Sequence, residues 1–251
     1  MKKFQKLLIC ILFLALSACG GGGGGGDSGT SNSGSSSPPA IGQASVLTDA
    51  QIISAIKATN SNWEGSNGHL SNGRPAGIWR WPNTPDQRIF VYLPAASNSV
   101  EQEMVRKVNA AISTYNSKLS AYFVLEAVTV IPASGNVIRV GYNNSWIPPG
   151  STDYNSYCAN VSDVAGSGSL INPDSKNNIA NPVYVNLGNN RCDVTQEIVN
   201  HEFAHALGFN VHFDFFGNTK SPDNFWDVLA TLYGNPQSTL AENLVVKHAA
   251  K

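Results

Sequence analysis

The chain has 251 residues, of which 16 are Lys or Arg and 17 are Asp or Glu, so its formal net charge is −1. If the first 18 residues are removed, three lysines leave with them, and 13 basic residues then face 17 acidic ones, a net charge of about −4. No basic stripe remains to hold phosphates, so the composition argues against a nucleic-acid partner.

The N-terminus has the layout of a secretory signal peptide. Three lysines precede an apolar run from Leu7 to Leu16, and small residues follow at once. This pattern predicts a signal peptide over residues 1–18. The apolar run is about half the length that crosses a bilayer, so the pattern disfavours a permanent transmembrane helix.

The run Leu16-Ser17-Ala18-Cys19 resembles the lipobox of bacterial lipoproteins. The resemblance implies cleavage before Cys19 and a lipid on Cys19, which would anchor the exported chain in the bacterial cell envelope. Gly20, directly after the cysteine, resembles the pattern of lipoproteins that Gram-negative bacteria sort to the outer membrane. An ordinary secretory cleavage near Ala18 is the alternative.

Residues 19–45 are rich in Gly and Ser with almost nothing apolar, which predicts a flexible tether behind the lipidated cysteine. Residues 46–251 are enough for a single domain with its own core. Cys10 leaves with the signal peptide, so Cys158 and Cys192 are expected to form a disulfide in an oxidising compartment. A two-cysteine metal site or a reactive thiol is the alternative.

The first half of the domain predicts a helix, a strand and a long helix. Thr48–Asn62 reads as a short helix with Thr48 or Asp49 as its N-cap. Arg88–Leu93 alternates like a strand. Ser99–Leu119 has the pattern of a long amphipathic helix. Its apolar residues, at spacings of three and four, are Val100, Met104, Val108, Ala111, Ile112 and Tyr115.

The second half adds strands and two helices. Residues 123–131, 137–142 and 182–187 are β-branched runs that predict strands. The long loop from 143 to 182 is expected to contain one short strand near 169–172. A histidine-bearing helix and a final helix near 225–233 follow. This order predicts an α+β fold, a twisted mixed sheet with the long helix, the histidine helix and the C-terminal helix on one side.

The segment HEFAHALGFNVH contains three of the five histidines of the chain. Asp193 is the expected N-cap of the helix and Gln196 its capping-box partner, which places the helix over Val194–Leu207. Residues four apart lie on one helix face, so His201 and His205 can direct both imidazoles at one metal ion.

A general base and a third ligand complete the predicted site. Glu202 lies about 100° round the helix from His201, beside the ligands, where its carboxylate can take a proton from water. Catalytic zinc usually has three protein ligands. Gly208 can end the helix in a left-handed conformation and turn the chain back. His212 is therefore the expected third ligand, and Asp214 is the competing choice.

The histidine cluster also has a structural explanation that needs no metal. The same helix presents a core-facing stripe, and the histidines could be satisfied core groups beside it. Three clustered imidazoles without a metal or a carboxylate partner would be costly to bury, which favours the metal site. The stripe consists of Val199, Phe203, Ala206 and Leu207.

The run from His201 to Gly208 resembles the zincin motif, and with Gly208 it resembles the metzincin metalloproteases, especially the matrixin-like ones. Arg88–Tyr142 resembles the upper half of that catalytic domain, and Trp226–Gly234 resembles its closing helix. The resemblance covers about 150 residues, of which the histidine motif is the specific part.

This resemblance implies a zinc metalloendopeptidase with a metzincin-like catalytic domain. The zinc ion would be held by His201, His205 and His212, with Glu202 as the general base and a peptide or protein as substrate. Two alternatives are a surface-binding lipoprotein that retains zinc without turnover and an amidase that acts on cell-wall peptides. The oligomeric state is left open.

The chain departs from the family pattern in two places. Metzincins have the third histidine three residues after the glycine, where this chain has Val211, so a turn one residue longer is required. They also have a methionine turn beneath the metal, whereas this chain has no methionine after Met104. Asn218–Asn224 would occupy that region.

For the remaining candidate residues we expect structural roles, or the sequence leaves two roles open. Tyr184 and Tyr233 are expected in the core, and His69 and His248 in solvent. The aromatic run Phe213, Phe215 and Phe216 could line a substrate pocket or anchor the loop. Val46–Pro82 precedes the part that resembles the family, and an inhibitory role for it stays open.

Overall fold

The computed structural model describes residues 47–61, 75–84, 86–180, 182–213 and 224–251. The expected signal peptide and tether lie outside the described residues. So do Cys19, His69, Asp214, Phe215 and Phe216. The fold and the site are therefore built from the described ranges alone.

Five strands form one mixed sheet. They are β1 (Arg88–Tyr92), β2 (Val124–Val128), β3 (Asn136–Tyr142), β4 (Ala159–Ser162) and β5 (Val183–Leu187). Their order across the sheet is β2-β1-β3-β5-β4. All neighbouring pairs are parallel except β4 with β5, which is antiparallel. The predicted mixed sheet in an α+β fold is confirmed.

The described helices are α1, α2, α3 and α4, with two short helical segments, η1 and η3. Their bounds are Asp49–Ile56 for α1, Ser99–Leu119 for α2, Gln196–Ala206 for α3, Asn224–Tyr233 for α4, Lys57–Ser61 for the π-helix η1 and Ala241–Asn243 for the 3₁₀-helix η3. No helix in the described ranges has the length and apolar character needed to cross a membrane.

The long helix α2 has the predicted bounds. Asn98 caps it by accepting a hydrogen bond from the Glu101 amide, and the apolar residues from Met104 onward face the core. Val100 is the exception, because its side chain is 58 % exposed. The prediction that placed Val100 on the buried stripe is wrong: it lies in the first turn, where the helix projects beyond the core.

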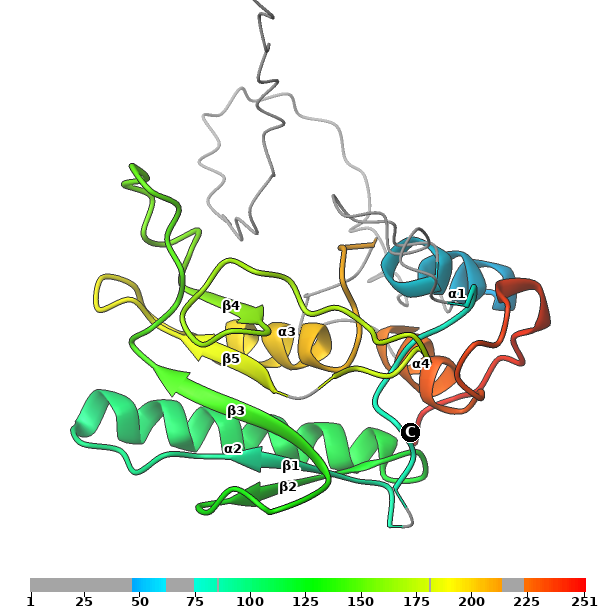
Figure 1. Cartoon of the computed structure of the whole chain (residues 1–251), viewed down its shortest axis with the longest axis horizontal. Helices are drawn as coiled ribbons and strands as arrows, with labels where there is room; N and C mark the ends of the chain where they lie inside the picture. The colour runs from blue at the N-terminus through cyan, green and yellow to red at the C-terminus, as the bar shows by residue number, and fades with distance from the viewer. Residues whose placement is uncertain (1–46, 62–74, 85, 181, 214–223) are drawn as a thin grey trace, which may run out of the picture.

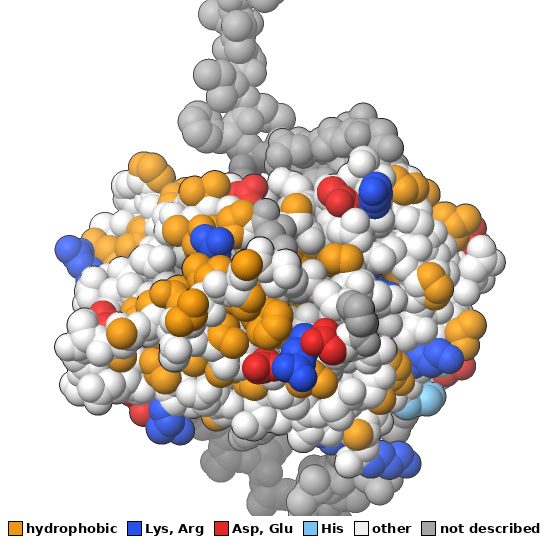
Figure 2. Space-filling view, turned by 60° about the horizontal axis from the view of Figure 1, so that its bottom comes forward, with side chains coloured by type: hydrophobic (Ala, Val, Ile, Leu, Met, Phe, Trp, Pro, Cys, Tyr) orange, Lys and Arg blue, Asp and Glu red, His pale blue; other side chains and the backbone are white. Residues whose placement is uncertain are grey.

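Helices α2 and α3 lie side by side along one face of the sheet (Figure 1). The strands turn alternate residues to that face, so Ile89 and Val91 of β1 are buried. The other face carries apolar as well as charged side chains, among them Phe90 and the ion pair of Arg88 with Glu126. On the face of the molecule that Figure 2 shows, hydrophobic side chains form a cluster, and charged side chains lie beside it.

Strand β4 lies at Ala159–Ser162, whereas a short strand was expected near 169–172. Residues 169–172 contain no strand, and the nearest pairing is an isolated bridge between Pro173 and Ile179. β4 follows directly on Cys158, which forms the predicted disulfide with Cys192 at a Cα–Cα distance of 5.7 Å. This bond ties the start of β4 to the segment that enters α3.

Candidate metal centre

Helix α3, which carries the histidines, begins two residues later than expected. Thr195 is its N-cap: the Thr195 hydroxyl accepts a hydrogen bond from the Ile198 amide at 3.2 Å. Asp193, predicted to be the cap, is an exposed side chain 3.8 Å from the Lys107 ammonium group. The Gln196 side chain donates to the Lys107 carbonyl at 2.9 Å, so it links α3 to α2 and forms no capping box.

The buried side of α3 is the predicted apolar stripe. Val199, Phe203, Ala206 and Leu207 have no exposed surface. The Tyr115 hydroxyl of α2 donates to the carbonyl of Asn200 at 2.7 Å, directly before the first histidine. These contacts fix the rotation of α3 about its axis and its position along that axis, relative to the rest of the core.

Helix α3 ends in a Schellman turn around Gly208. The Phe209 amide donates to the Ala204 carbonyl at 3.1 Å and the Gly208 amide to the His205 carbonyl at 2.9 Å. Gly208 has φ +109°, a conformation that side-chain-bearing residues rarely adopt. The predicted left-handed turn is confirmed, and it brings the chain back toward the histidines of the helix.

The turn brings the third histidine to the first two. Nε2 of His201 lies 3.0 Å from Nε2 of His205 and 3.1 Å from Nε2 of His212. The ligand atoms of all three lie within 4.8 Å of one another. We call these residues the histidine triad. They lie close enough to bind one metal ion, and they come from two different segments, helix and loop.

The protonation of the triad suits metal binding. Nδ1 of His205 makes a short hydrogen bond to the Phe209 carbonyl; a carbonyl only accepts, so Nδ1 carries the proton and Nε2 keeps its lone pair. Burial lowers the pKa of His201 to about 2 and that of His205 to about 4, with the neighbouring imidazoles adding to the effect. Neutral imidazoles are the form that ligates metals.

The spacing of the triad also fits a metal ion. In a tetrahedral zinc site, bonds of about 2.0–2.1 Å place two ligand nitrogens about 3.3 Å apart, close to the spacing of His201 from its two neighbours. Without a cation, the converging lone pairs of neutral imidazoles repel one another. A proton shared between two nitrogens removes this repulsion for only one pair of histidines at a time. The donor set therefore fits one divalent metal ion.

Glu202 follows the first ligand on α3, and its side chain is only 4 % exposed. Burial raises the pKa of its carboxyl group to about 8. A buried glutamate is unusual unless a partner stabilises its charge. A metal cation held by the triad would favour the ionised form of this carboxyl group.

The other candidate residues have structural contacts. The Tyr233 hydroxyl donates to the Leu207 carbonyl at 2.9 Å, inside the core, as expected. The expectation that Tyr184 lies in the core is wrong: it is half-buried on the far face of the sheet, where its hydroxyl accepts a hydrogen bond from Arg139. His248 is largely exposed but also pairs with Asp227 at 2.9 Å. Phe213 packs edge-on against the buried Phe209 ring, which favours the anchoring role.

Several residues that hold the site could not be found from the sequence. The Trp81 indole donates to the Ala206 carbonyl at 2.9 Å, and Thr59 and Asn60 contact the loop after Gly208. Trp81 lies 125 residues before Ala206. No local pattern signals a contact over that separation.

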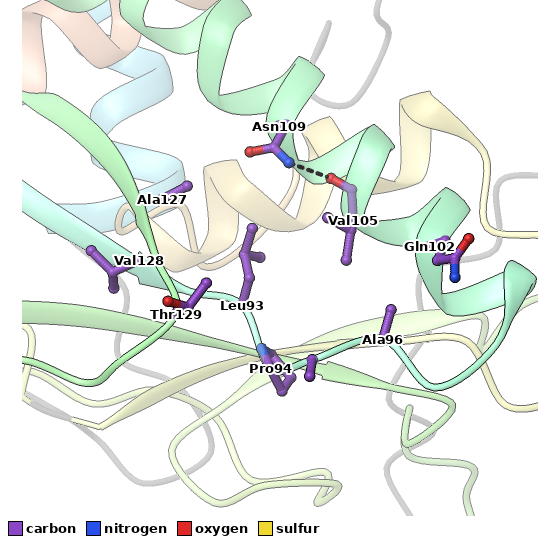
Figure 3. A pocket seen from close by; sticks show the side chains of 10 residues that line it. Leu93, Pro94, Ala96, Gln102, Val105, Asn109, Ala127, Val128 and Thr129 are labelled. Carbon is purple, nitrogen blue, oxygen red and sulfur yellow. Dashed lines mark hydrogen bonds between the residues drawn. The ribbon is translucent and has the colours of Figure 1, made fainter.

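A cavity of about 480 Å³ lies elsewhere, between α2 and the carboxyl ends of β1 and β2. Its lining is mostly small and apolar, including Leu93, Pro94, Val105 and Val128, with Asn109 at the helix side (Figure 3). It contains no histidine, cysteine or carboxylate, so it lacks the groups needed for metal binding or acid–base chemistry.

Comparison with known proteins does not identify a family. No protein-family model matches the chain, and no curated protein matches it at a significant level.

Proposed function

We propose that this protein is a zinc-dependent peptidase whose metal is held by His201, His205 and His212. The observation that carries the proposal is the convergence of three imidazole nitrogens, with a buried glutamate directly after the first of these histidines on α3. Imidazole is a preferred ligand of zinc. Three protein ligands leave a fourth position for water or substrate, as in catalytic zinc sites, whereas structural sites are closed by four.

Exposure of the triad supports a site that substrate can reach. His212 is exposed and His201 and His205 are partly exposed, while the glutamate beside them is buried. A site that held zinc only for structure would gain nothing from an open side or from an adjacent base. These features favour catalysis over a binding lipoprotein that retains zinc.

Glu202 is the proposed general base. Zinc, when bound, supplies a Lewis acid that polarises the scissile carbonyl and makes water more acidic. The Glu202 carboxylate accepts a proton from the attacking water and returns it to the leaving amine nitrogen. Its burial keeps it out of bulk solvent and strengthens its response to a nearby cation.

The arrangement of strands offers a place for an extended peptide. β4 is the terminal strand of the sheet, and it lies over α3 (Figure 1). Extended peptides commonly bind by adding to the edge of a sheet. A peptide alongside β4 would thus run close to the helix that carries two of the ligands.

The proposal extends to family and location. The chain resembles metzincins, especially the matrixin-like ones, in its motif, and its mixed sheet, long helix, histidine helix and C-terminal helix are compatible with that resemblance. From the lipobox-like run we propose an exported lipoprotein that is anchored through Cys19 in the bacterial outer membrane. The Cys158–Cys192 disulfide is consistent with an oxidising compartment.

The test measures zinc per chain and the cleavage of a mixed peptide library, with and without a chelator. Cell-wall peptides in the same assay distinguish the amidase alternative. Glu202→Gln is expected to retain zinc and lower kcat by at least about 100-fold, because it removes the base alone. The matched control is Glu197→Gln, an exposed glutamate of the same helix, with unchanged turnover. Full activity in Glu202→Gln would refute the assigned role.

A further inference from the structure

The loop between Gly208 and His212 is held by side chains from the N-terminal segment. The Thr59 hydroxyl donates to the Val211 carbonyl at 2.6 Å, and the Asn210 amide donates to the Thr59 carbonyl at 2.9 Å. Thr59 is fully buried and lies 152 residues before Val211. These two hydrogen bonds hold the residues directly before the third ligand.

Asn60 holds the start of the same loop. Its side-chain amide donates to the Gly208 carbonyl at 2.8 Å and to the Trp79 carbonyl at 2.8 Å, and its side-chain oxygen accepts from the Trp79 amide at 3.0 Å. The Trp79 indole donates to the Asn60 carbonyl at 2.9 Å. Asn60 is also fully buried. It connects the turn after α3 to a fixed point in the core.

Thr59 and Asn60 both belong to the π-helix η1. In η1 three consecutive polar residues, Thr59, Asn60 and Ser61, are buried together. Single π-helical turns are rare and occur frequently at functional sites. In this protein the side chains of Thr59 and Asn60 both contact the segment from Gly208 to Val211.

The three ligands differ in what positions them. His201 and His205 are placed by α3, whose backbone hydrogen bonds are internal to the helix. His212 lies in the loop beyond the helix, so its place depends on hydrogen bonds made to that loop from outside. When the Thr59 hydroxyl is removed, the Val211 carbonyl loses this hydrogen bond and the loop is held less firmly in place.

We infer that Thr59 and Asn60 are positioning residues for the third metal ligand, and that the α1–η1 segment is part of the metal centre. The inference rests on the proposed metal site. Thr59 and Asn60 touch neither metal nor substrate; they hold the loop so that the His212 ring meets the other two. Their loss lowers metal affinity because binding must then order the loop.

The test uses the full chain and measures zinc affinity by competition with a chelating dye, together with the visible spectrum of the Co²⁺ form. Thr59→Val removes the hydroxyl and keeps the branched shape. It is expected to weaken zinc affinity by about tenfold or more, within the range of ligand-supporting residues. Its Co²⁺ spectrum shifts as the third imidazole is lost. Thr59→Ser restores the hydroxyl and is expected to restore both signals.

Thr231→Val is the matched control. Thr231 is equally buried, and its hydroxyl donates to the carbonyl and accepts from the amide of Lys247 in the C-terminal segment. It should lower thermal stability while leaving zinc affinity unchanged. If Thr59→Val does not fold, Thr59→Ala removes the hydroxyl without placing a methyl against the Val211 carbonyl and carries the same expectation.

The outcomes separate this inference from the proposed function. Wild-type affinity and spectrum in Thr59→Val or Thr59→Ala would overturn the positioning role alone. A wild-type chain that takes up no zinc would overturn the metal site and the inference with it. A chain whose zinc affinity depends on the Thr59 hydroxyl but that cleaves no peptide would contradict the peptidase proposal and leave the positioning role supported.

Discussion

Reduction of the Cys158–Cys192 disulfide is expected to lower the free energy of unfolding by about 4 kcal/mol. The bond closes a loop with a sequence separation of 34 residues, for which the chain-entropy relation gives about 4 kcal/mol at 25 °C. The physical reason is that the cross-link restricts the unfolded chain more than the folded one. The bond also joins the start of β4 to the segment before α3.

The measurement is urea unfolding of the metal-free protein in the oxidised and the reduced form, with a chelator in both buffers and a phosphine reductant only in the buffer of the reduced sample. With a urea slope of about 2.5 kcal/mol/M, the midpoint should fall by about 1.5 M on reduction. The double variant Cys158→Ala/Cys192→Ala should match the reduced protein. Coincident unfolding curves for the oxidised and reduced forms would refute the calculation.

The other predictions concern the site helix and pH. Thr195→Ala removes the cap of α3 and should cost about 1 kcal/mol in chemical unfolding while zinc stoichiometry is retained; an unchanged midpoint would contradict the cap. In the metal-free protein, burial lowers the pKa values of the histidine triad, which favours neutral imidazoles in the folded state. The stability that the triad contributes is therefore fully present above pH about 6.5, and it is lost as the pH falls below that value. Glu202, whose pKa is raised to about 8, acts in the opposite direction because its protonated form is favoured in the fold, so it offsets part of the loss that the histidines cause. Unfolding curves that coincide at pH 7 and pH 5 would contradict this sign.

The elements with strong periodicity were predictable from the sequence. Helix α2 has its predicted bounds because its apolar residues repeat over 21 residues, and β1 and β5 are apolar runs bounded by turns. Strand β4 was misplaced because ANVS carries no such pattern. Of its four residues, Val161 faces the helices, and Ser162 accepts a hydrogen bond from Asn186 on the other face. Its pairing with β5 is a tertiary contact.

The metal centre was predictable as far as local geometry reaches. Helical spacing brings His201 and His205 together, and Gly208 predicts the turn. Placing the cap at Asp193 failed because two candidate caps lie two residues apart, and Thr195 is the one whose hydroxyl reaches the helix amides. Thr59 lies about 150 residues from the loop that it holds. Only the fold reveals that contact.

The central claim, that the histidine triad holds one zinc ion, is tested most directly by elemental analysis of the purified chain. The chain is first incubated with zinc and then freed of excess metal. The account predicts close to one zinc per chain, with much less in His201→Ala, His205→Ala and His212→Ala variants that remain folded. A folded wild-type chain without zinc, or variants that retain it in full, would contradict the account.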